Sequence, residues 1–222
     1  MHDDFSPPPV SGGWDSALLA PVAEINQQML AGLRQMALDP VPDDGPSGAP
    51  SDARDQAPSA PRLVTLLRAD WRRLDAGAQR RVAACPYLLL DAGFAQPQRW
   101  ERAPCPGVMD ASSQRGYFSG RDGVALVRRT LVLAWHLARA NRVSGRVILG
   151  MSALSAERIA TARLADLEAL AELGPGWIVP RWEAQPPVWR QLIDAGCRGQ
   201  PLLLRQAQLR GLQLLARPNG PG

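Results

Sequence analysis

"DGVALVRRTLVLAWHLARANRVSGRVIL", residues 122–149, carries the strongest helical pattern in the chain. At about 100° of rotation per residue, its large apolar side chains gather on one side of a helix. A second side, within an arc of roughly 60°, carries basic residues and one tryptophan: Arg128, Trp135, Arg139, Arg142 and Arg146. Val124, Leu131 and Val132 also lie toward that second side. Apolar surface on more than one face predicts a long central helix, either inside the domain or at a subunit interface.

The segments that follow this helix also favour helices. Residues 154–173, LSAERIATARLADLEALAEL, have the length and pattern of a helical hairpin, and helices are expected again at 186–196 and 200–217. Before it, residues 62–74 and 76–85 read as two helices, and Asp75 is a suitable N-cap for the second. Only GWIVPRW, within the Gly/Pro-bounded stretch 174–185, resembles a strand. The predicted fold is all-α, with a helical domain over residues 62–217.

The first 61 residues are expected to form a flexible N-terminal extension that contains one helix. Residues 1–15 and 39–61 are rich in Pro, Gly, Ser and Asp, a composition typical of disordered segments and linkers. Between them, residues 16–38 repeat apolar side chains at helical spacing, which predicts an amphipathic helix. This tethered helix has two interpretations: it docks onto a partner, or it folds back onto its own domain. The sequence leaves both open.

Composition narrows the class of protein without defining its activity. All 25 basic residues are Arg, and the net charge is +4, which permits contact with nucleic acid or an acidic partner. The absence of Lys together with abundant Ala, Gly, Pro and Arg suggests a GC-rich bacterial genome. Three cysteines without CxxC spacing are most simply reduced thiols. With no signal-peptide pattern and no long uncharged apolar run, we expect a cytoplasmic protein that does not bind membranes.

The hairpin at 154–173 raises the question of DNA reading. A recognition helix needs basic or amide side chains near its start to contact base edges and phosphates. The second helix here instead carries Asp166, Glu168 and Glu172, whose carboxylates would repel phosphate. We therefore expect the hairpin to bury apolar side chains: Leu154, Ile159, Leu164, Leu167, Leu170 and Leu173. If DNA is bound, the arginines of residues 122–149 offer a better surface, because the guanidinium fork suits phosphate. The alternative is that they form a solvated face paired with the chain's own carboxylates.

Residues 126–193 resemble FlhD, the non-catalytic helical subunit of the bacterial flagellar master transcriptional activator. The resemblance rests on three features in order: an apolar helix ending in RVILGM, the paired helices AERIATARLADLEALAE, and IVPRW followed by another helix. It implies an all-α homo-oligomer that joins an FlhC-like partner at promoter DNA, with much of the DNA contact and the zinc on the partner. This chain departs from the family in an N-terminal extension of roughly 120 residues and in its last helix.

Catalytic and metal-binding patterns are missing from the sequence. His136 is the only histidine beyond the N-terminal tail, and a lone histidine forms neither a triad nor a zinc site. Ser152 and Ser155 are interpreted as helix caps.

Trp177, Arg181 and Trp182 form a dense cluster of residue types that are common at binding hot spots, and we expect both tryptophans to make surface contacts. Trp189 is expected in the core.

Two hypotheses follow from these observations. The first is a non-enzymatic, FlhD-like transcriptional regulator subunit without a cofactor, acting as a helical oligomer with a protein partner and contacting DNA weakly or only through that partner. The second is a protein–protein interaction adaptor with no DNA role. The candidate binding residues are the same for both: Arg128, Trp135, Arg139, Arg142, Arg146, Trp177, Arg181 and Trp182.

Overall fold

The computed structural model describes residues 16–39, 60–101, 117–118, 120–172 and 175–216. Within these residues the chain is helical almost throughout, which confirms the predicted all-α class. The helices are α1 (Ser16–Leu38), α2 (Arg62–Leu66), α3 (Arg68–Arg73), α4 (Ala76–Ala83), α5 (Gly120–Ala140), α6 (Arg142–Leu149), α7 (Ala153–Thr161), α8 (Leu164–Glu172), α9 (Pro186–Arg198) and α10 (Pro201–Ala216). Among the described helices, none has an uncharged apolar stretch of the length that a membrane span requires. The predicted disordered segment 1–15 and nearly all of the predicted linker 39–61 lie outside the described residues.

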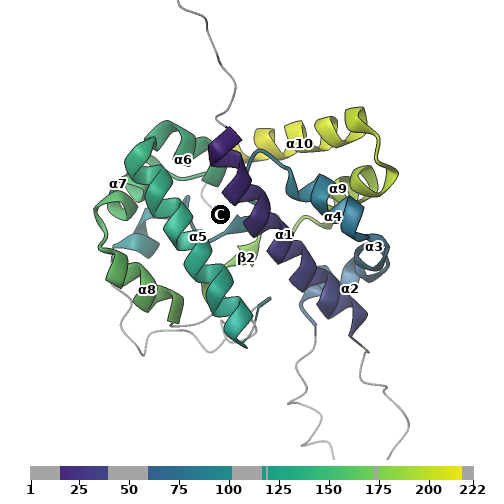
Figure 1. Ribbon diagram of the computed structural model, residues 1–222, viewed down its shortest axis with the longest axis horizontal. Helices are drawn as coiled ribbons and strands as arrows, with labels where there is room; N and C mark the ends of the chain where they lie inside the picture. Colours follow the sequence, from purple (N-terminus) through teal and green to yellow (C-terminus); the bar gives the residue numbers. More distant parts are fainter. Residues whose placement is uncertain (1–15, 40–59, 102–116, 119, 173–174, 217–222) are drawn as a thin grey trace, which may run out of the picture.

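Helix α1 packs into the core of the same body as the helices that follow it. Figure 1 shows α1 running diagonally across the molecule, with α5 on one side and α2–α4 on the other. The apolar side chains that repeat along it at helical spacing are buried: Val22, Ile25, Met29, Leu30 and Leu33. Of the two interpretations of residues 16–38, the structure therefore supports the helix that folds back onto its own domain.

The side chain of Asn26 joins α1 to the end of α4 and the loop after it. The residue is fully buried, and its amide nitrogen donates hydrogen bonds to the carbonyl oxygens of Ala83 (3.2 Å) and Tyr87 (3.0 Å). Its amide oxygen accepts from the backbone N–H of Leu89 (2.8 Å). A buried amide with three satisfied bonds fixes both the position and the rotation of α1.

Residues 62–85 form three short helices that cover one side of α1. The predicted helix at 62–74 is interrupted at Leu67, which separates α2 from α3. Asp75 caps α4 as expected, because its carboxylate accepts a hydrogen bond from the Ala78 N–H at 2.7 Å. This bond holds the pKa of the Asp75 carboxyl below its usual value.

A two-stranded antiparallel sheet connects the middle of the chain to its C-terminal part. Strand β1 (Leu90–Asp91) pairs with β2 (Val179–Pro180), with Leu90 opposite Pro180. Strand β2 lies in GWIVPRW, the one stretch in which the sequence suggested a strand.

Helix α9 then packs against α3 and α4, and its Trp189 meets Trp71 with 5.3 Å between ring centroids. Trp189 is fully buried, which confirms its predicted place in the core.

Candidate functional site

The predicted long helix at 122–149 is two helices, and this changes the candidate surface. Helix α5 ends at Ala140, and Asn141 takes an extended conformation (φ −154°, ψ 93°) that starts α6. The Asn141 side chain accepts a hydrogen bond from the Ser144 N–H at 3.0 Å, so it is an N-cap inside the predicted helix. The expected arc is therefore wrong, because Arg142 and Arg146 belong to a different helix from Arg128, Trp135 and Arg139.

Of the three predicted residues on α5, Arg128 and Trp135 contact other parts of the chain, and Arg139 contacts Trp135 on the same helix. Arg128 forms an exposed ion pair with Glu172 of α8, with 3.6 Å between nitrogen and oxygen. The Trp135 indole N–H donates to the Ala162 carbonyl oxygen at 3.0 Å, and the Arg139 guanidinium lies 4.6 Å from the centre of the Trp135 ring. Trp135 therefore fastens the junction between α7 and α8 to α5.

Arg139, Arg142 and Arg146 remain exposed at the junction of α5 and α6. Among the described residues, no carboxylate lies within ion-pair distance of these three guanidinium groups. Two exposed valines, Val143 and Val147, lie on the same short helix. This part of the predicted basic surface is therefore available to an anionic partner.

Two residues of the second predicted cluster, Trp177 and Arg181, lie in the core. Trp177 is only 6% exposed, beneath the Arg99 guanidinium at 4.5 Å and beside Trp100, so its expected surface contact is wrong. Arg181 is 7% exposed and donates to the carbonyl oxygens of Leu88 (2.6 Å) and Leu149. Burial lowers the pKa of its guanidinium, and the Asp91 carboxylate and Tyr87 oppose that effect. Arg181 thus joins three distant segments of the backbone instead of facing a ligand.

Trp182, the third residue of this cluster, is half-buried. Its backbone lies in the left-handed region (φ 52°), and its ring meets Tyr87 edge-on at 5.8 Å. Because Tyr87 is itself fully buried, Trp182 is largely an extension of the core and only its outer part reaches solvent.

The hairpin of α7 and α8 behaves in part as predicted. Ile159, Leu167 and Leu170 are buried, and Glu168 and Glu172 face solvent. Leu154 and Leu164, by contrast, are each 44% exposed, because they lie in the first turns of their helices on the outer side. Leu173 lies outside the described residues. Asp166 pairs with Arg163 at 2.7 Å, and this lowers the pKa of its carboxyl.

A groove that the sequence does not reveal runs between α1 and α5. It has a volume of about 590 Å³ and is open along one side. Apolar side chains form most of its lining, and four charged or polar side chains complete it. The lining residues are Leu18, Pro21, Glu24 and Ile25 from α1, and Arg128, Arg129, Val132, Leu133, His136, Leu137 and Ala140 from α5.

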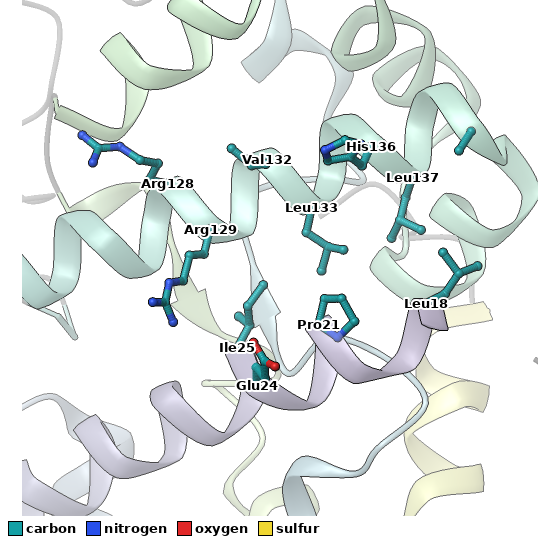
Figure 2. A pocket seen from close by; sticks show the side chains of 11 residues that line it. Leu18, Pro21, Glu24, Ile25, Arg128, Arg129, Val132, Leu133, His136 and Leu137 are labelled. Carbon is teal, nitrogen blue, oxygen red and sulfur yellow. The ribbon is translucent and has the colours of Figure 1, made fainter. Parts of the chain in front are cut away.

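The groove is chemically different at its two ends. Figure 2 shows Leu18 of α1 close to Leu137 of α5 at one end, while Arg128 and Arg129 lie toward the other. Arg129 donates a hydrogen bond to the Gln28 side-chain oxygen at 3.3 Å, and Glu24 is the one carboxylate in the lining. One end is therefore mainly apolar, with the His136 imidazole beside it, and the other carries two cations.

The described residues hold no group of three or more His, Cys, Asp or Glu side chains placed to bind a metal ion. His136 is exposed and lines the groove, and no second histidine is described. Cys85 is buried, which raises the pKa of its thiol to about 12 despite hydrogen bonds with Tyr87 and Gln208 that lower it. Cys105 lies outside the described residues.

Comparison of the chain with protein families, curated proteins and solved structures gives no significant match.

Sequence reasoning missed the groove because its two walls lie about a hundred residues apart in the chain. Two local signals were nevertheless present. Val132 is an apolar residue on the polar side of α5, and Pro21 interrupts the hydrogen bonding of α1 on its exposed side. Both residues line the groove.

Proposed function

We propose that this chain is a non-enzymatic helical subunit that acts by binding a partner protein in the groove between α1 and α5. The groove is the observation that carries the proposal. Its floor is formed by Ile25, Leu133 and Leu137 of the core, while the half-buried Leu18 and Val132 and the exposed Pro21 and Ala140 leave apolar surface open to solvent. Covering exposed apolar surface of this kind with a partner lowers the free energy and so favours the complex.

A macromolecular partner fits this groove better than a small metabolite. Small-molecule sites enclose most of the ligand and direct a few convergent polar groups at it. Here the lining is mostly apolar, with Leu133 and Ile25 facing each other in Figure 2, and Arg128 and Arg129 lie toward one end instead of converging on the middle. A surface between two packed helices is also a common docking place for a third helix.

A DNA-contacting role, as in an FlhD-like transcriptional regulator subunit, is the second candidate function. The exposed guanidinium groups of Arg139, Arg142 and Arg146, without carboxylate partners among the described residues, favour it. Such a subunit would also bind a partner protein, so the two proposals are compatible. They differ in whether the basic surface contributes to binding.

In-cell photocrosslinking tests the proposed function. A photoreactive amino acid is placed at Val132 in the groove, at Pro21 on the opposite wall, and at Glu168, an exposed residue of α8, as the control. In cells of the source organism, positions 132 and 21 should give the same discrete protein adduct, and position 168 should not. If positions 132 and 21 give no adduct, or all three positions give the same set, the groove is not the partner site.

A further inference from the structure

We infer that the groove between α1 and α5 binds an amphipathic helix of about three turns, one end of which is acidic. This inference rests on the proposed function and names the chemistry of the partner at the same site.

The length of the groove sets the length of the partner helix. Along α5 the lining extends from Arg128 to Ala140, twelve residue steps or about 18 Å at 1.5 Å per residue. Along α1 it extends from Leu18 to Ile25, about two helical turns. A helix of about twelve residues would match the longer wall, with apolar side chains at positions i, i+3, i+4 and i+7 facing the floor.

The charges at the groove set the polarity of the partner. Two guanidinium groups, those of Arg128 and Arg129, stand at one end, against the single carboxylate of Glu24. The opposite end, around Leu18 and Leu137, is apolar apart from the neighbouring His136 imidazole. An acidic end on the partner would meet both arginines, whereas a basic end would be repelled by them.

The present contacts of these arginines are weak enough to be exchanged. The ion pair of Arg128 with Glu172 spans 3.6 Å, and its side chains are 47% and 70% exposed. The hydrogen bond from Arg129 to Gln28 is also on the surface, at 3.3 Å. Exposed pairs of this kind contribute little to stability, so carboxylates of a partner can replace them at small cost.

The alternative occupants fit these observations less well. A second copy docked through the same groove would offer Arg128 and Arg129 only the carboxylate of Glu24, and an uncharged apolar ligand would leave both arginines without a role. An amphipathic helix with an acidic end is therefore the occupant that fits both the apolar floor and the two arginines.

The experiment measures fluorescence anisotropy of two labelled 14-residue helical peptides with the full-length chain. Both peptides carry leucines at i, i+3, i+4 and i+7; one has three glutamates at one end and the other has three lysines there. The acidic peptide should bind about tenfold more tightly at low salt, and the difference should shrink at high salt. The variant Arg128→Glu/Arg129→Glu should reverse the preference. The control Arg80→Glu/Arg205→Glu makes the same change in net charge at exposed positions of α4 and α10 and should preserve it.

Three results would overturn the inference. Equal affinity for both peptides, lost in Val132→Arg, would mean that a helix binds without charge selection, and the proposed function would survive. Stoichiometric binding of an apolar dye with no binding of either peptide would make the groove a small-ligand site. A dimer in sedimentation that Val132→Arg dissociates would assign the groove to a second copy. Circular dichroism and urea unfolding of each variant confirm that it is folded.

Discussion

Replacing Asn26 with leucine should detach α1 from the rest of the core, and with it one wall of the groove. The substitution removes three buried hydrogen bonds, to Ala83, Tyr87 and Leu89, and places an apolar side chain against backbone groups that still need partners. A buried backbone group that loses its partner costs about 1–3 kcal/mol. Part of this cost is offset by the greater hydrophobicity of leucine. We expect a net loss of about 3–5 kcal/mol, a large fraction of the stability of an ordinary domain.

Urea unfolding followed by circular dichroism measures this loss, and hydrogen exchange along residues 16–38 locates it. The matched control is Gln27→Leu, the same chemical change at the next position of α1, where the side chain is exposed. The control should change stability by less than about 0.5 kcal/mol. A loss below about 1 kcal/mol for Asn26→Leu, with α1 as protected as in the parent, would refute the assignment of Asn26 as the residue that fixes α1.

Three further substitutions test other parts of the structure. Arg181→Met should destabilise the chain by about 2–4 kcal/mol, because the buried carbonyl oxygens of Leu88 and Leu149 lose their donor; the exposed Arg205→Met is the control, and equal stability of the two variants would contradict this role. Cys85→Ala should make the free energy of unfolding fall less steeply at alkaline pH. The Cys85 thiol has a pKa of about 12 in the folded chain and 9.0 in the unfolded chain. Its contribution to stability is therefore complete below pH 9 and is lost as the pH rises toward 12. Between pH 9 and 11 the parent should lose about 2–3 kcal/mol more than the variant in urea unfolding, and parallel pH curves would refute it. Arg139→Glu/Arg142→Glu should weaken any binding of duplex DNA in fluorescence anisotropy, more at low than at high salt. The DNA affinity of Asp166→Ala/Glu168→Ala should stay unchanged or rise slightly. The opposite pattern would make the α7–α8 hairpin the DNA-contacting element.

Most of the helical segments were predictable, because they bury an apolar stripe that is visible as periodicity in the sequence. The bounds of α1 follow directly from such a stripe. The break at Asn141 was not predictable in the same way, since apolar and basic side chains continue in phase across it. A local hydrogen bond from the Ser144 N–H to the Asn141 side chain ends the regularity there. A capping residue thus ends a helix here without interrupting the apolar pattern.

The errors at Trp177 and Arg181 have a different cause. Both lie in a Gly- and Pro-rich segment that resembles a surface loop, and both residue types are common at interfaces. Their burial depends on partners far away in the chain: Arg99 for Trp177, and Leu88 and Leu149 for Arg181. Likewise, α1 and α5 meet across about a hundred residues, and no local pattern indicates which helix packs beside which. The site therefore depends on long-range packing, which periodicity alone does not specify.

Nitrogen–proton correlation spectra of the full-length, ¹⁵N-labelled chain, recorded while the acidic 14-residue peptide is added, would locate partner binding residue by residue. We predict that the shifted amide signals belong to residues 18–25 of α1 and 128–140 of α5, and that signals from α9 and α10 stay in place. Saturable shifts centred on α6 or α10, with the groove signals unchanged, would contradict the proposal that the α1–α5 groove is the site of partner binding.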